Sequence, residues 1–159
     1  MDSEVNLYLL RAEDEFLLAR NDMRISLEQE TKEYLGIQKN KTFFHSVINH
    51  AYYSIFYATK AYLYIKGIIT TIPDEHLKTY NELKRLAING IIDKELIRIY
   101  ETEIIKADSL LKIFKLEKGK RGKFVYNVKS EANLPFAEES INNAKKFIST
   151  IKLLINKGE

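Results

Sequence analysis

The sequence predicts an all-α fold, an antiparallel up-and-down bundle of about five helices. Five segments place apolar residues on one side at helical spacing, and none shows a convincing strand period. Of the 159 residues, 45% are apolar and 30% charged, with only 6 Gly and 2 Pro, which is typical of a globular helical protein. This length fits a single domain covering residues 1–159.

The first two predicted helices form a long hairpin that frames the bundle. The first runs from about Glu4 to Gln29, and a polar connection over residues 36–41 follows it. Its apolar face has the spacing 4-3-4-3-4 and consists of Val5, Leu9, Ala12, Phe16, Ala19 and Met23. The second helix is rich in tyrosine, runs from about Thr42 to Lys66 and ends at Gly67.

A seam of small residues follows the tyrosine-rich helix and consists of Ala51, Ser54, Ala58 and Ala61. Small side chains let a neighbouring helix approach closely. We therefore expect this helix at the centre of the bundle or at a dimer interface.

Three further helices complete the predicted bundle. Pro73 is expected in the first turn of the third, which ends at Asn89-Gly90 and has a face of Leu77, Tyr80, Leu83 and Ala87. Asp93 is the predicted N-cap of the fourth, which extends to Phe114. The last begins near Asn133-Leu134-Pro135 and closes at Gly158; its face consists of Ala137, Ile141, Ala144, Ile148, Ile151 and Ile155. Residues 124–128 have the pattern of a short extended piece.

Composition excludes several classes of function. The absence of cysteine removes disulfides, thiol nucleophiles and thiolate metal sites. The first residues lack the basic-then-apolar order of a signal peptide. No apolar run approaches the ~18 residues that span a bilayer. We therefore expect a cytoplasmic protein without membrane contact. A net charge of +3 does not by itself indicate nucleic-acid binding.

Neither a metal nor a cofactor is predicted. His45 and His50 are five residues apart and point about 140° away from each other on a helix, so they are not the i, i+4 pair that binds zinc. No His-Glu-x-x-His or Glu-x-x-His run supports a di-metal carboxylate site, and no P-loop motif is present.

Two groups of residues are candidates for ligand binding. Beside the small-residue seam, a stripe at helical spacing consists of His50, Tyr53, Tyr57, Lys60 and Tyr64. Such a stripe can stack bases and contact phosphates, or its rings can belong to the core or an interface with their hydroxyls at the edge. The glycine-containing loop after the fourth helix carries the second group, Lys118, Lys120, Arg121 and Lys123. This loop either follows a phosphate backbone or is simply a solvated basic run.

The segment VINHAYYSIFYATKAYL at residues 47–63, with KGI at 66–68, resembles the signature helix of the HEPN family, specifically its small archaeal and bacterial branch. HLK at 76–78, GIIDK at 90–94, the Ala107-Asp108 pair and AEES at 137–140 fit the same family, so the resemblance covers about Glu4 to Leu154. It implies a helical bundle, frequent homodimers and a role around RNA or nucleotides. Many members are RNases, often toxins paired with a small nucleotidyltransferase antitoxin.

The family RNases use an Arg-x4–6-His motif, which this sequence does not retain. His50 stands where the arginine is expected, and Tyr57 where the histidine is expected. Arginine is a fixed phosphate-binding cation and histidine a switchable acid or base, whereas a phenol, with an ordinary pKa of about 10, is a poor base at neutral pH. We therefore expect a non-catalytic, dimeric module that binds a nucleotide, RNA or a nucleotidyltransferase-type partner. The alternatives are a metal-independent RNase that uses His50, and a purely structural oligomerisation domain.

Overall fold

A computed structural model describes residues 2–111 and 133–158, with the side chains of residues 109–111 excepted. This part of the chain contains six α-helices and no strand: α1 (Ser3–Leu27), α2 (Gln29–Leu35), α3 (Phe44–Ile65), α4 (Glu75–Ile88), α5 (Lys94–Leu111) and α7 (Leu134–Lys157). The predicted all-α bundle is confirmed. Of the described helices, none is both long enough and apolar enough to cross a membrane.

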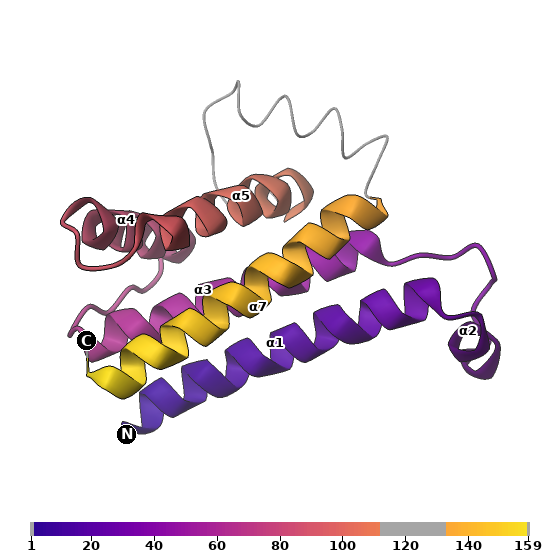
Figure 1. Ribbon diagram of the computed structural model, residues 1–159, viewed down its shortest axis with the longest axis horizontal. Coiled ribbons are helices and arrows are strands. Elements are labelled where there is room, and N and C mark those ends of the chain that lie inside the picture. The colour runs from indigo at the N-terminus through magenta and orange to yellow at the C-terminus, as the bar shows by residue number, and fades with distance from the viewer. Residues whose placement is uncertain (1, 112–132, 159) are drawn as a thin grey trace.

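The helices form layers around α3, the tyrosine-rich helix (Figure 1). The long helices α1, α3 and α7 lie roughly along one direction, and α1 packs against both α3 and α7. On the other side, α4 and α5 pack against α3 and make no contact with α1. Helix α1 is therefore an outer helix of the bundle, whereas α3 touches four neighbours.

The small-residue seam explains why α3 is central. Ala51, Ser54, Ala58 and Ala61 are all fully buried, and the long helices α1 and α7 make the most extensive contacts with α3. The small side chains of this seam permit the close approach of both helices. Of the two positions predicted for the helix, the centre of the bundle is the one observed. The seam is consequently filled by packing within one copy of the chain.

Helix α1 ends earlier than predicted, and a separate short helix follows it. Glu28 leaves helical geometry, with φ −90° and ψ 116°, and α2 begins at the next residue. Side-chain bonds hold the break: Ser26 Oγ donates to the carbonyl of Asp22 and accepts from the backbone N–H of Phe43. The tie to Phe43 spans 17 residues in sequence, so helical spacing within α1 gives no sign of it.

The start of the third predicted helix was also wrong. Asp74 has φ 60°, a left-handed conformation that interrupts the helical path, so α4 begins at Glu75 and Pro73 lies before it. The buried face of α4 consists of Thr79, Leu83, Leu86 and Ala87, and Leu77 lies outside it with 38% of its surface exposed.

Most other predicted helix ends are confirmed. Gly67 has φ 73° and follows α3, while the N–H of Ile68 bonds to the carbonyl of Leu63. Asp93 Oδ1 accepts a 2.7 Å hydrogen bond from the N–H of Glu95 at the start of α5. Asn133 caps α7 and Gly158, in a left-handed conformation, ends it. The predicted helix end at Phe114, the extended piece at 124–128 and the basic loop lie outside the described residues.

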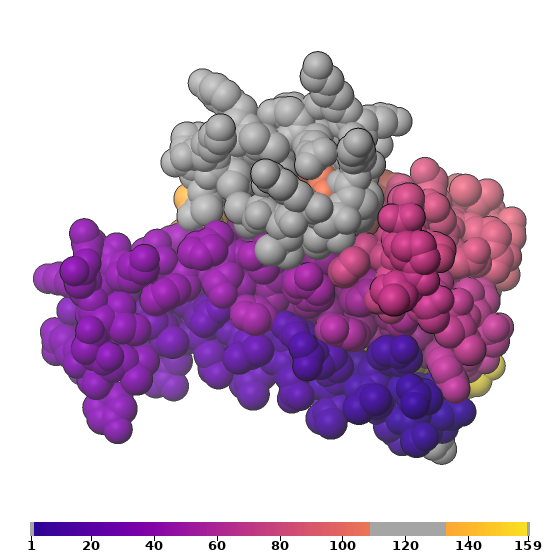
Figure 2. Space-filling view, turned by 180° about the vertical axis from the view of Figure 1, so that it is seen from behind, coloured from indigo at the N-terminus to yellow at the C-terminus, as the bar shows by residue number. Residues whose placement is uncertain are grey.

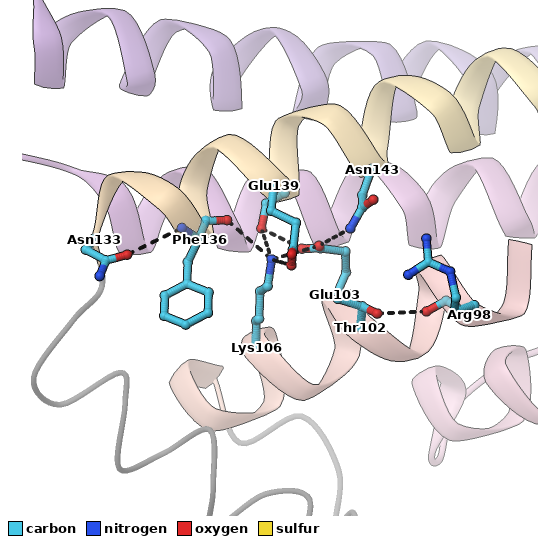
Figure 3. Close-up of polar contacts among 9 residues, drawn as sticks. Arg98, Thr102, Glu103, Lys106, Asn133, Phe136, Glu139 and Asn143 are labelled. Atoms are coloured by element: carbon cyan, nitrogen blue, oxygen red, sulfur yellow. Dashed lines mark hydrogen bonds and ion pairs between the residues drawn. The ribbon is translucent and has the colours of Figure 1, made fainter. Parts of the chain in front are cut away.

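A buried polar cluster joins α5 to α7 (Figure 3). Glu103 and Lys106 are almost fully buried, and their charged atoms lie 3.0 Å apart. Ser140 donates a 2.6 Å hydrogen bond to Glu103 Oε2 and Asn143 a 2.9 Å bond to Oε1, so both carboxylate oxygens are satisfied. Lys106 also donates to the carbonyl of Phe136 and pairs with Glu139. Burial of two charges is tolerated here because each has several partners.

Candidate ligand-binding depression

The tyrosine stripe of α3 divides into two parts in the structure. His50, Tyr53 and Tyr57 line an open depression of about 460 Å³ at the surface where α1 and α3 meet. Lys60 and Tyr64 lie outside this depression; Tyr64 packs beside Tyr8 of α1, with the ring centroids 6.4 Å apart. The stripe therefore does not form one continuous surface.

Lys60 is engaged inside the protein. Only 5% of its side chain is exposed, and its ammonium bonds to Glu75 and to the carbonyl of Thr70. It also lies 5.2 Å from the centroid of the Tyr8 ring, a cation–π distance. This lysine fastens the segment before α4 and the start of α4 to α3, and its ammonium does not face the depression.

Two charged residues of α1 face His50 across the depression. Glu15 is buried, and its Oε2 lies 2.6 Å from Nδ1 of His50. The guanidinium of Arg11 lies 3.1 Å from Oε1 of the same carboxylate. Arg11 and Glu15 are four residues apart on a helix and so project from the same side. Glu15 therefore orients the imidazole and the guanidinium together.

A second carboxylate lies on the other side of the imidazole. Oδ2 of Asp22 is 3.8 Å from Nε2 of His50 and accepts a 2.6 Å hydrogen bond from Ser46. Each carboxylate thus has a partner: Arg11 and His50 for Glu15, and Ser46 for Asp22. The acidic groups hold the rest of the site in place.

Aromatic faces form another part of the lining. The rings of Tyr53 and Tyr57 are stacked with an interplanar angle of 29°, and the guanidinium of Arg11 lies 5.3 Å from the centroid of the Tyr57 ring. Burial raises the pKa of the Tyr53 phenol, and the nearby Tyr57 and Glu15 raise it further. Tyr53 therefore keeps its proton at neutral pH and offers a hydrogen-bond donor.

Asn49 also lines the depression and carries a buried acceptor. Its Oδ1 atom is buried and has no hydrogen-bond partner among the described residues. Leaving a buried acceptor unpaired costs about 1–3 kcal/mol. A ligand that donates a hydrogen bond after a small movement of the lining would recover part of this cost.

The chemistry of the site suits a flat polar ligand. In the described part of the chain, no group of three or more His, Cys, Asp or Glu side chains is arranged to hold a metal. The lining combines ring faces, a guanidinium, an imidazole, an amide, a hydroxyl and the Glu15 carboxylate. This combination can stack a planar ring and form directional hydrogen bonds at its edge.

Sequence reasoning located His50, Tyr53 and Tyr57 but missed the residues around them, Arg11, Glu15, Ser46 and Asn49. One signal was present: Glu15 and Asp22 lie on the same helical row as the buried Ala12, Ala19 and Ser26. A carboxylate on a buried row needs a partner, which is a reason to search for one. The phosphate-contact candidates Lys118, Lys120, Arg121 and Lys123 lie outside the described residues.

No family model matches this chain, and no curated protein matches it significantly.

Proposed function

We propose that the protein is a HEPN-like, non-catalytic module that binds a nucleotide or an unpaired RNA base in the depression between α1 and α3. The observation that carries the proposal is the convergence of Arg11, His50, Asn49 and the Tyr53–Tyr57 ring pair on one open depression. The resemblance of residues 47–68 to the HEPN signature helix supports the same class of ligand. A homodimer and a small nucleotidyltransferase partner are the assemblies that this resemblance implies.

Each part of the lining has a role in this proposal. The tyrosine rings provide stacking surfaces for a base, and stacking on an aromatic side chain contributes about 1–3 kcal/mol. Arg11 and His50 lie at hydrogen-bonding distance from Glu15 and can turn toward a phosphate or a base edge. Asn49 provides an amide, the side-chain group that pairs with two adjacent atoms of adenine.

The proposal is tested by measuring the affinity of purified protein for fluorescently labelled single-stranded RNA, and for nucleoside monophosphates, at low salt. Replacing Tyr57 by alanine removes a stacking surface, so we expect the Kd to rise about 5- to 150-fold, the equivalent of the stacking energy. Tyr57→Phe keeps the ring and should retain most of the affinity. The variant Arg11→Ala should also weaken binding.

Two matched controls are available in the same chain. Tyr34 on α2 is 90% exposed and does not line the depression, so Tyr34→Ala removes a tyrosine ring without changing the lining of the site. Arg85 pairs with Glu82 on α4 as Arg11 pairs with Glu15, so Arg85→Ala matches Arg11→Ala. The proposal fails if the wild type binds no probe, or if the control variants lose as much affinity as the site variants.

One observation favours the second candidate, a metal-independent RNase that uses His50. The arginine absent from the family motif on α3 has a counterpart in Arg11 of α1, and Glu15 holds both Arg11 and the imidazole. A histidine oriented by a carboxylate is a common acid–base arrangement. Cleavage of structured RNA by the wild type, lost in His50→Ala and reduced in Glu15→Gln, would support this activity. Equal cleavage by wild type and His50→Ala would exclude it.

A further inference from the structure

The charges in the depression between α1 and α3 compensate one another. The two helices lie side by side in Figure 2, where α1 is indigo and α3 is magenta. Of the described residues that line the depression, Arg11 alone has a permanent positive charge, and Glu15 is the one acid. Lys60, the other cation of the tyrosine stripe, bonds to Glu75 and to the Thr70 carbonyl instead. The described lining therefore has no surplus of positive charge.

Glu15 engages the basic groups of the site with both of its carboxylate oxygens. Its Oε1 lies 3.1 Å from the Arg11 guanidinium, and its Oε2 lies 2.6 Å from Nδ1 of His50. The side chain of Glu15 is only 8% exposed, whereas that of Arg11 is 57% exposed. A buried carboxylate depends on its partners, so moving Arg11 away from Glu15 is strongly unfavourable. Arg11 is thereby held as the partner of an acid of the same chain.

A second carboxylate adds negative charge beside the imidazole. Oδ2 of Asp22 lies 3.8 Å from Nε2 of His50 and accepts the hydrogen bond of Ser46. The imidazole thus has an acid near each of its ring nitrogens. A phosphate that approached His50 would meet two carboxylates and a guanidinium that is already paired. Since like charges at such distances repel, these acids disfavour a phosphate.

The groups that stay available to a ligand are uncharged. Tyr53 and Tyr57 supply aromatic rings, and the buried Oδ1 of Asn49 has no hydrogen-bond partner among the described residues. Aromatic rings combined with amide and hydroxyl groups match a nucleobase, which stacks through its face and carries donors and acceptors at its edge. The lining is therefore complementary to the base of a nucleotide and not to its phosphate.

We propose that the depression takes the uncharged base of a nucleoside and leaves the phosphate in solvent, and that Glu15 sets this specificity by occupying Arg11 and His50. The inference rests on the proposed function and narrows its ligand to the base alone. It also separates the two candidate functions, because an RNase must hold the scissile phosphate beside its acid–base group. A depression that excludes phosphate fits the non-catalytic module.

Paired titrations of nucleosides and nucleotides test this specificity. Adenosine, guanosine, cytidine and uridine are each compared with their 5′-monophosphates by NMR titration of the purified protein. For each base that binds, we expect the nucleoside to bind at least as tightly as its monophosphate. The Kd of the nucleoside should also be the same at about 50 mM and about 500 mM salt, because salt screens only interactions between charges.

The variant Glu15→Gln should shift the preference toward the monophosphate. The amide keeps the size of the side chain but releases the charge of Arg11. The Kd of the monophosphate should therefore fall about tenfold, while that of the nucleoside stays within about threefold. The matched control is Glu13→Gln, which makes the same change in net charge on the same helix. Glu13 is exposed, pairs with Lys152 and does not line the depression, so both Kd values should stay at the wild-type level.

A second variant covers the case in which Glu15→Gln does not fold, since Glu15 is buried. Circular dichroism measures the helix content of each variant. Asp22→Asn removes the other acid from a less buried position, where 23% of the side chain is exposed. It should shift the preference in the same direction by a smaller factor of about threefold, because Asp22 lies further from the imidazole than Glu15 does.

The possible results distinguish this inference from the proposed function. A wild type that binds the monophosphate more than about fivefold tighter than the nucleoside overturns the inference and leaves the proposed function standing. An unchanged preference in the folded acid variants overturns the role assigned to Glu15. Absence of binding by every nucleoside and every monophosphate contradicts the proposed function and, with it, the inference.

Discussion

At the scale of single residues, the polar side chains of α3 have different tasks although they share one stripe. His50 faces the solvent-open depression, whereas the ammonium of Lys60 is directed to Glu75 and the carbonyl of Thr70. Helical spacing predicts that both lie on the same side of α3, and it does not predict what covers them. The segment that covers Lys60 lies ten to fifteen residues further along the chain.

Replacing Lys60 by methionine should destabilise the fold. The substitution keeps most of the side-chain volume but leaves the Thr70 carbonyl and the Glu75 carboxylate without their cation, which should lower the free energy of unfolding by about 1–3 kcal/mol. Urea denaturation measures this value. The control is Lys78→Met, because Lys78 donates to the neighbouring Thr71 carbonyl from an exposed position. Equal small effects in both variants would contradict the role assigned to Lys60.

His76 should make stability depend on pH. Burial lowers its pKa below the ordinary value of 6.5, although the nearby Glu75 acts in the opposite direction. Burial also raises the pKa of the Tyr52 phenol well above its usual range, and its oxygen lies 2.7 Å from Nδ1 of His76, in a hydrogen bond whose direction depends on the imidazole tautomer. Because burial lowers the pKa of His76 in the folded state, the unfolded chain takes up a proton on this imidazole more readily than the folded chain does.

The sign follows from this difference in proton uptake. Stability contributed by neutral His76 is fully present above pH 6.5 and is lost as the pH falls below that value toward the lowered pKa of the folded state. Urea midpoints between pH 8 and pH 5 should therefore fall less in His76→Gln than in the wild type. The exposed His45→Gln serves as the control. Parallel pH profiles of wild type and His76→Gln would show that the ring does not couple to folding.

At the scale of helices, the contact between α5 and α7 depends on a buried ion pair. Lys106→Met leaves the fully buried Glu103 without its cation, and breaking a buried pair in this way costs about 3–5 kcal/mol. Replacing both partners, in Glu103→Leu/Lys106→Met, removes the unpaired charge and should cost less than the single substitution. Urea denaturation of the three proteins decides this. A double variant less stable than the single one would contradict the explanation.

Helix positions were more predictable from the sequence than helix ends and the contacts between helices. The apolar faces of α1, α5 and α7 and the small seam of α3 follow from spacing, because burial repeats with the helical period. The C-terminal end of α1 and the start of α4 do not follow from helical spacing. A hydrogen bond from the N–H of Phe43 to Ser26 stabilises the end of α1, and the left-handed conformation of Asp74 sets the start of α4. Such determinants are visible only when the neighbouring segment is in place.

The same difference applies to the candidate site. His50, Tyr53 and Tyr57 are on one helix, so their shared side was predictable. Arg11 and Glu15 come from α1. Glu15 lies 35 residues before His50 in the sequence. Their position depends on how α1 packs against α3, which no local pattern in the sequence specifies.

At the scale of the whole molecule, the layered arrangement uses α1 on two sides. One side packs on α3 and α7, and another lines the depression with Arg11 and Glu15. The small-residue seam inside the bundle brings α1 close enough to α3 for Glu15 to reach His50. The packing of the bundle and the lining of the depression are thereby connected through one helix.

The proposed binding of a nucleotide or an RNA base in the depression between α1 and α3 is best tested by NMR titration. Isotope-labelled protein is titrated with adenosine monophosphate and with a short single-stranded RNA. We predict that the amide signals of residues 11, 15, 46, 49, 50, 53 and 57 shift together and saturate, while those of α2 and α4 stay in place. Absence of shifts, or saturable shifts confined to another face, would contradict the claim.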